Sequence, residues 1–365
     1  MKGNKFKDVI IFSFLGLGDF VWATSAISLI KQYDKNIKLT LITFDSFYNL
    51  IDSNLVDDNI LINSKLFNYK CKIVRYIYKL YWFFKTFFYL YKRETIIFFD
   101  ISQALGFASK YVYKIKNIIG PNNHQFGFNI KNSASKYYTQ IINLPSDKDR
   151  LHCMIAYQLI VRSLFPTYNL SIPKLKDTEY LFEKINEKYL KNTKKYKVAL
   201  CLSGNGKNRY WEINNFVKLM DEIEKIKREV SFFVVGSGEK HLEEAKQLIA
   251  KSKNKNIINL INQTSLLEIK ELLKNIDLLI SVDTGLVHIA SVYNKNIICL
   301  YGQSLPERSG AVNSNSVRMC SYRECSPCTD GKQLKNKICK NPLCMQDITP
   351  EMVMEKIREI LNEKK

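Results

Sequence analysis

The chain alternates short apolar runs with helix-like stretches, and this pattern begins twice. Near the N-terminus an apolar run at residues 9–14 is followed by a Gly-x-Gly turn, a helix-like stretch at 20–31 and a second apolar run at 37–44. The second half restarts with an apolar run at 197–203. Strand, glycine turn, helix and strand in this order are typical of a βαβ unit, whose strands are parallel. We therefore expect an α/β protein with two doubly wound parallel sheets.

The remaining elements follow from the same alternation. Further strands are expected at 95–99, 116–120, 230–235, 257–260, 277–282 and 296–301, and helices at 212–227, 241–250, 265–274 and 286–293. The lysine-rich stretch 184–197 fits a linker or an exposed helix. A chain of 365 residues is long enough for two cores.

We place the N-terminal domain at 1–180, the second domain at 181–318, a cysteine-rich knuckle at 319–348 and a C-terminal helix at 349–365. Two such domains facing across a cleft would suit an enzyme with two substrates.

The charge balance favours a polyanionic partner. The 55 lysines and arginines outnumber 35 acidic residues, which gives a formal charge of +20. Nucleic acid, anionic lipid and phosphorylated substrates are the partners that such a charge attracts. A general bias toward Lys, Asn, Ile, Tyr and Phe explains the charge equally well. The 46% hydrophobic and 25% charged fractions exclude a disordered chain, a collagen-like chain and a small disulfide scaffold.

Two apolar stretches invite a targeting or membrane interpretation. The first is the apolar run near the N-terminus, which could be taken for a signal peptide. It ends at Gly16, Gly18 and Asp19 and lacks the small-residue cleavage site of a signal peptide. We therefore expect a buried strand here and a cytoplasmic protein. The second, residues 76–99, is interrupted by Lys79 and other charges, which leaves no window of ~20 apolar residues. We predict an aromatic, basic helix followed by a strand. Such a helix either packs on a sheet, which we favour, or lies on a membrane surface.

Ligands of open α/β sheets bind at the carboxyl ends of the strands, and four loops there are unusual. In the first, Gly16 and Gly18 permit a close backbone approach, and Asp19 is either a helix cap or a functional carboxylate. The second spans 203–211, where small residues with free amides precede Lys207 and Arg209. This loop suits a phosphate or diphosphate, with an exposed basic loop as the alternative.

The third and fourth loops lie in the second domain. The turn at Gly236 is a weak signal by itself. At Asp283, Thr284 and Gly285 a strand ends and a helix begins, so the amides there could hold a phosphate. His288, one turn into that helix, either donates to a phosphate or packs in the core.

Four segments carry a resemblance to a known family. Residues 16–32 resemble the N-terminal signature of glycosyltransferase family 9, the ADP-heptose:lipopolysaccharide heptosyltransferases, and 281–308 resemble its C-terminal signature. Residues 208–223 are similar to the family's Lys/Arg-x-Trp-Pro-Glu segment, and 233–248 to the strand, turn and helix after it. The chain departs from the pattern where Arg209 replaces the usual lysine, since the two cations bind differently. It also lacks the proline after Trp211.

The resemblance implies a GT-B fold of two Rossmann-like domains and an inverting transfer of heptose from ADP-heptose to a sugar hydroxyl of the lipopolysaccharide core. Asp19 matches the family's candidate general base, a role for which a carboxylate is suited. Gly16 and Gly18 would lie on the acceptor side. No metal is required for the reaction. The residues expected to bind the sugar donor are Ser203, Gly204, Asn205, Lys207, Arg209, Gly236, Asp283, Thr284, Gly285 and His288.

Five of the nine cysteines lie within residues 320–344. Cys325, Cys328, Cys339 and Cys344 have a spacing that suits four thiolate ligands, and Cys320 would be the spare. We expect a structural zinc or iron ion, with free thiols in a surface lobe as the alternative. In the resembling family, protein-modifying heptosyltransferases of autotransporters carry a cysteine-bound metal here.

Three functions are therefore open. The leading hypothesis is a heptosyltransferase of the lipid A-core oligosaccharide, working at the inner face of the cytoplasmic membrane. The second is a protein O-heptosyltransferase that modifies Ser of a surface protein, which the cysteine knuckle favours. The third is a nucleic-acid-binding protein. The dispersed basic residues and the two nucleotide-type sheets argue against this last reading.

Overall fold

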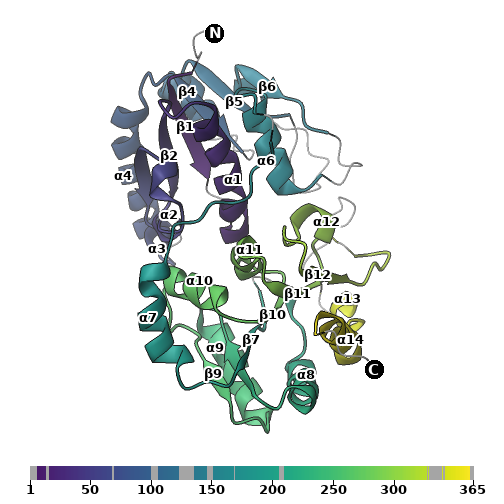
Figure 1. Cartoon of the computed structure of the whole chain (residues 1–365). Coiled ribbons are helices and arrows are strands. Elements are labelled where there is room, and N and C mark those ends of the chain that lie inside the picture. The colour runs from purple at the N-terminus through teal and green to yellow at the C-terminus, as the bar shows by residue number, and fades with distance from the viewer. Residues whose placement is uncertain are drawn as a thin grey trace. The chain divides into compact units, whose positions relative to one another are not determined.

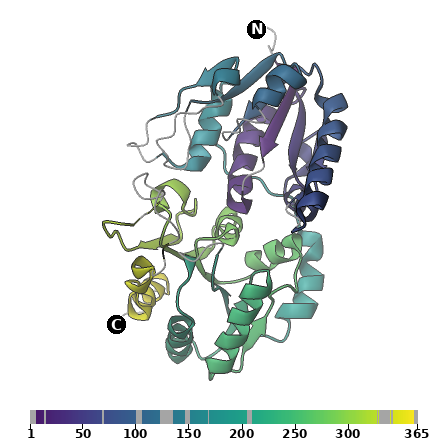
Figure 2. The same cartoon turned by 180° about the vertical axis from the view of Figure 1, so that it is seen from behind.

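The protein forms two compact units, residues 1–176 and 177–365. Figures 1 and 2 show the computed structural model from opposite sides. It describes residues 6–13, 16–67, 70–99, 106–122, 135–145, 151–167, 169–204, 209–326, 328, 339 and 342–361. The boundary between the two units, after residue 176, lies before the domain boundary that we placed after residue 180.

The first unit is built on a six-stranded parallel sheet in the order β3-β2-β1-β4-β5-β6. Ile10 of β1 pairs with Thr40 of β2 on one side and Ile96 of β4 on the other. The chain therefore builds the sheet outward from β1 in both directions. The strands are β1 (Asp8–Ser13), β2 (Lys38–Phe44), β3 (Asp58–Ile62), β4 (Thr95–Phe98), β5 (Asn117–Pro121) and β6 (Gln140–Ile142).

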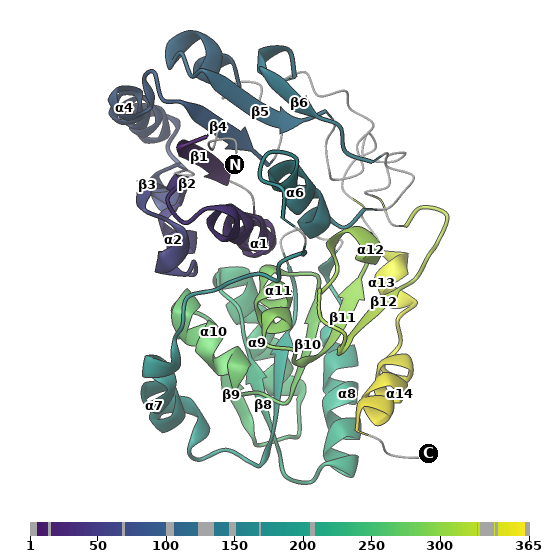
Figure 3. The ribbon, with the colours of Figure 1, turned by 45° about the horizontal axis from the view of Figure 1, so that its top comes forward.

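Helices cover both faces of this sheet (Figure 3). Successive side chains of a strand point to opposite faces. Ile96 and Phe98 of β4 accordingly cluster with Trp82 of α4, while Phe99 stacks on Tyr157 of α6 with ring centroids 5.2 Å apart. The helices are α1 (Leu17–Tyr33), α2 (Asp45–Tyr48), α3 (Ser64–Phe67), α4 (Lys72–Leu90), α6 (Cys153–Arg162) and the π-helical segment η2 (Ala108–Val112).

The second unit repeats the topology, with strand order β12-β11-β10-β7-β8-β9. Its strands are β7 (Tyr196–Cys201), β8 (Val230–Val234), β9 (Ile257–Asn259), β10 (Leu278–Val282), β11 (Asn296–Tyr301) and β12 (Ser316–Cys320). Its helices are α7 (Phe182–Ile185), α8 (Ile213–Ile226), α9 (Glu239–Lys251), α10 (Leu266–Lys274), α11 (Gly285–Val292), α12 (Pro306–Ser309), α13 (Leu343–Gln346) and α14 (Pro350–Ile360).

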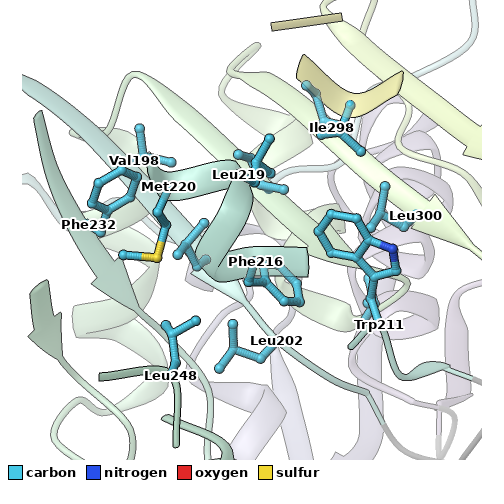
Figure 4. Close-up of a cluster of buried hydrophobic side chains, with 14 of the residues drawn as sticks. Val198, Leu202, Trp211, Phe216, Leu219, Met220, Phe232, Leu248, Ile298 and Leu300 are labelled. Carbon is cyan, nitrogen blue, oxygen red and sulfur yellow. The ribbon is translucent and has the colours of Figure 1, made fainter. Parts of the chain in front are cut away.

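The core of the second unit lies between α8 and the sheet (Figure 4). Phe216, Leu219 and Met220 recur at helical spacing on α8, and all are buried against the strands. Trp211 packs edge-on to Phe216 and donates its indole N–H to the carbonyl of Ile348 at 2.7 Å. The C-terminal segment is thereby tied to the loop that precedes α8.

Three strands were not expected from the sequence: β3, β6 and β12. Each is short and carries polar residues, so its hydrophobic pattern is weak. The lysine-rich stretch 184–197 forms helical turns and then enters β7. No helix in the described part of the chain is long and apolar enough to cross a membrane.

Candidate functional site

The strand order of the second sheet reverses between β7 and β10. In open α/β sheets, ligands bind at such a switch point, beyond the carboxyl ends of the strands. Ser203 and Gly204 follow β7, and Asp283 and Thr284 follow β10. The two loops singled out in the sequence for a phosphate thus meet at one place. This convergence makes the loops after β7 and β10 the candidate site of the second unit.

Asp283 is the centre of a small polar cluster in this site. Its side chain is only 7% exposed, yet its Oδ2 lies 3.1 Å from Nη2 of Arg209 and accepts a hydrogen bond from the Ser304 hydroxyl at 2.6 Å. Arg209 also donates to Ser304 at 3.3 Å. A buried carboxylate needs such partners to stay charged. Ser304, which follows β11, was not expected from the sequence because a lone serine in a loop carries no signal.

Position 204 has no room for a side chain, so it requires glycine. A Cβ atom here would meet the carbonyl oxygen of Asp283 at 2.9 Å and Cδ of Arg209 at 3.1 Å. The Gly204 amide donates to the carbonyl of Arg209, and Ser203 and Tyr210 form a β-bridge, so the loop closes on itself. The loop therefore holds Arg209 beside β10. Two expected ligand residues of this loop, Asn205 and Lys207, lie outside the described residues.

Helix α11 begins at the same place. Thr284 is its N-cap residue, Gly285 its first residue, and both are partly exposed. The first amides of a helix have no partner within it and favour an anion. His288 lies one turn further and is 3% exposed, which places it in the protein interior. Thr284 and Gly285 are thus the accessible groups of this helix start.

A second buried carboxylate supports the loop after β7. The hydroxyl of Ser203 donates to Oε2 of Glu244 on α9 at 2.5 Å, and Lys240 lies 3.4 Å from the other carboxylate oxygen. Glu244 was missed in the sequence because an acidic residue in a charged helix looks solvated. The turn before α9 contains Gly236, whose φ of 148° suits glycine alone. Burial raises the pKa of the nearby Cys201 thiol, which keeps it protonated.

In the first unit, Asp19 lies at the corresponding switch point, between β1 and β4. Gly16 is the N-cap residue of α1, and Asp19 occupies the first turn together with Gly18. Asp19 is therefore not the cap itself, although its charge suits the helix start. It is partly exposed, and the Tyr157 hydroxyl donates to its Oδ1 at 3.3 Å.

The four cysteines expected to bind a metal ion differ in burial. Cys344 is buried on α13, whereas Cys325 is exposed. Burial raises the pKa of Cys328, and the charges of Cys344, Cys325 and Cys339 raise it further. In the described residues, which include all four expected ligands, no three side chains stand close enough to hold a metal ion. The arrangement therefore does not present a formed metal site.

Residues 140–338 match the sequence model of glycosyltransferase family 9 (heptosyltransferase). The chain belongs to this family. The match contains the loops after β7 and β10, and it confirms the resemblance drawn from the sequence. The glycine turn before α1 lies outside it.

Two lipooligosaccharide heptosyltransferases are similar to this chain over part of their length. The lipooligosaccharide heptosyltransferase 2 of Campylobacter jejuni is 30% identical over 181 residues, which is 48% of this chain and 54% of that protein. The protein of the same name from Haemophilus influenzae is 26% identical over 43% of this chain and 44% of its own length. The chain thus matches about half of these relatives.

Solved structures are similar over the whole chain. E. coli ADP-heptose lipopolysaccharide heptosyltransferase II has a TM-score of 0.72 and 14% identity, covering 98% of this chain and 99% of its own. A family 9 protein from Veillonella parvula has a TM-score of 0.76 and 15% identity, with 99% coverage of both chains. The iron-containing dodecameric glycosyltransferase TibC from E. coli scores 0.57 at 12% identity, over 99% of this chain and 78% of its own. These likenesses confirm the predicted GT-B fold.

Proposed function

We propose that this protein is an inverting glycosyltransferase that transfers heptose from ADP-heptose to a sugar hydroxyl of the lipopolysaccharide or lipooligosaccharide inner core. Family 9 membership supports the transfer of a glycosyl group. An E. coli heptosyltransferase of the same fold has been solved with ADP, and TibC with ADP-D-β-D-heptose. These complexes support ADP-heptose as the sugar donor. We place the reaction in the cytoplasm, where a lipid-linked acceptor would be met at the inner face of the membrane.

The observation that carries the proposal is the polar cluster at the switch point of the second sheet. Asp283 fixes Arg209 beside the first amides of α11. Nε of Arg209 is buried, and no partner for it lies in the described part of the chain. A guanidinium held next to a helix start is suited to a diphosphate, which accepts hydrogen bonds and carries negative charge. The same groups would stabilise the charge that develops on the leaving ADP.

Asp19 is the proposed general base. Inversion requires one carboxylate to take the proton of the acceptor hydroxyl while the diphosphate leaves from the opposite face of the sugar. Asp19 is accessible in the first turn of α1, and Tyr157 donates a hydrogen bond to it, which fixes the direction of its carboxylate. Gly16 leaves room beside it, because a Cβ at that position would stand 3.3 Å from the Asp19 carboxylate. None of these steps requires a metal ion.

A protein acceptor is the second candidate, and the cysteine segment favours it. TibC, whose fold is similar, is an iron-containing heptosyltransferase. We propose that Cys325, Cys328, Cys339 and Cys344 hold a structural zinc or iron ion. Four thiolates leave no open position, so such an ion would stabilise the lobe without taking part in the transfer.

Two measurements test the proposed function. In a thermal-shift panel, ADP and ADP-heptose should raise Tm, whereas UDP- and GDP-sugars should not. A ligand at about 100 times its Kd adds about 2.7 kcal/mol to the free energy of unfolding. Transfer of labelled heptose should then be compared between a lipid A-core acceptor and a surface-protein acceptor. Stabilisation by UDP- or GDP-sugars alone would contradict the proposed donor, and transfer to protein alone would replace the lipid acceptor.

A further inference from the structure

Helix α4 has an apolar face that none of the described residues of the first unit covers. One side of the helix packs on the sheet through Trp82, Thr86 and Leu90, which are all buried. The opposite side carries an apolar stripe at the spacing i, i+4, i+7, i+11 and i+15, formed by Ile73, Ile77, Leu80, Phe84 and Phe88. This spacing returns each residue to the same side of a helix.

The exposure of this stripe is large. Phe88 is 82% exposed, Ile73 70% and Phe84 56%, and Tyr81 beside them is 58% exposed. Single exposed apolar residues are ordinary, but a continuous row along a helix indicates an interaction surface. The expectation that α4 packs on the sheet is met by one of its faces only.

The charges around the stripe have one sign. Residues 59–93 contain eight basic side chains and no acidic one. Lys72 and Lys79 flank the stripe on one side, and Lys85 flanks it on the other, since each residue turns a helix by about 100°. All three are exposed. Long side chains in these positions can extend away from the apolar stripe and reach polar groups above it.

The segment η2 is followed by a residue that packs on α4, and it exposes an aromatic ring of its own. Tyr113, just after η2, packs against Phe83 and Phe87 of α4 with ring centroids 6.0 and 6.3 Å apart. On η2, Tyr111 is 55% exposed, and the ammonium of Lys110 lies 5.5 Å from the centroid of its ring. An exposed aromatic ring beside a lysine therefore occurs on η2 as well.

We propose that the α4 face, defined as the apolar stripe with its flanking lysines, docks this protein onto an anionic lipid surface. An interfacial helix buries its apolar side in the lipid headgroup region while its lysines reach the phosphates. A second copy of this chain is disfavoured as the occupant, because a two-fold interface would place the same positive patch against itself. The proposal rests on this surface and holds for a lipid or a protein acceptor alike.

Vesicle flotation of the full chain tests this. The protein should float with vesicles of phosphatidylcholine mixed with phosphatidylglycerol, and much less with phosphatidylcholine alone. The double variant Phe84→Ser/Phe88→Ser should lose flotation. Leu170→Ser/Ile172→Ser is the matched control, because those residues are also exposed, by 52% and 69%, and should float unchanged. In Lys72→Gln/Lys85→Gln, binding should weaken about fivefold for each lysine removed.

Each of the following results would overturn the proposal. If Phe84→Ser/Phe88→Ser floats as well as the parent protein, the apolar stripe does not bind the membrane. If the protein floats equally with both vesicle types, the lysines do not contribute to binding through lipid charge. Sedimentation equilibrium supplies the third: a dimer that the double variant dissociates would make a second copy the occupant. If the serine variant fails to fold, as judged by its thermal melt, the lysine variant decides, since both lysines are exposed and its unchanged flotation would refute the proposal.

Discussion

The guanidinium of Arg209 lies 3.1 Å from the buried carboxylate of Asp283, and these two residues come from different loops of the second sheet. The ion pair joins the loop after β7 to the loop after β10, at the point where the strand order reverses. Because Asp283 neutralises part of the guanidinium, Arg209 serves as a positioned donor of hydrogen bonds rather than as a free positive charge. The lysine common at this position in the family carries all its donors on one nitrogen, whereas arginine carries them on a planar fork.

The first prediction concerns this arginine. Arg209→Lys keeps the charge but replaces the planar guanidinium, whose Nη2 contacts both Asp283 and Ser304, with a shorter side chain that ends in a single nitrogen. We expect ADP to bind about tenfold more weakly, a change of about 1.4 kcal/mol, by isothermal titration calorimetry. Arg228→Lys is the matched control, because Arg228 is exposed before β8 and far along the strand from the site. Equal ADP affinity in both variants would remove Arg209 from the site.

Glu244 should act through Ser203. Glu244→Ala leaves the Ser203 hydroxyl without its acceptor, so we expect the free energy of unfolding to fall by about 2 kcal/mol and ADP binding to weaken. Glu244→Gln restores an acceptor and should recover most of both losses. Urea unfolding and calorimetry on the same preparations separate the two effects. Recovery of stability without recovery of ADP affinity would mean that the charge of Glu244 matters beyond its hydrogen bond.

The sequence predicted the sheets better than it predicted what supports the site. Strong apolar runs such as 277–282 indicate buried parallel strands, and glycine turns mark their carboxyl ends. The partners Glu244 and Ser304 could not be predicted, because their roles depend on contacts between residues distant in the chain. The helix at 76–93 was expected, but its open face could not be: its aromatic residues occur on both sides, and only packing shows which side is covered.

Asp19→Asn tests the proposed base. The amide has the shape of the carboxylate but cannot take a proton from the acceptor, so turnover should fall by about 10²-fold or more. ADP should bind as before, since Asp19 belongs to the first unit and the proposed donor residues to the second. Tyr157→Phe, which removes the hydrogen bond to Asp19, should lower kcat by a smaller factor. Normal turnover by Asp19→Asn would exclude this residue as the base.

Lys270 should make stability depend on pH. Burial lowers the pKa of this lysine from 10.5 to about 8, although its ammonium donates to Thr178 at 2.7 Å. Between these values the unfolded chain binds more protons than the folded one, so stability rises with pH. Relative to Lys270→Met, the free energy of unfolding should rise by about 2 kcal/mol from about pH 7.5 to about pH 10. If the free energy of unfolding of the parent protein and of Lys270→Met changes equally over this pH range, the lowered pKa is contradicted.

The last prediction concerns the cysteine segment. Protein purified without chelator should carry about one zinc or iron ion per chain by elemental analysis, as four thiolates bind one ion. Cys328→Ser should lose the ion and lower Tm, because a bound ion would link this residue to the buried Cys344. Cys320→Ser is the matched control and should keep the ion, since the spacing leaves Cys320 as the spare. If the protein, once stripped of metal, keeps the Tm of the untreated protein, the cysteines are free thiols, as in the alternative.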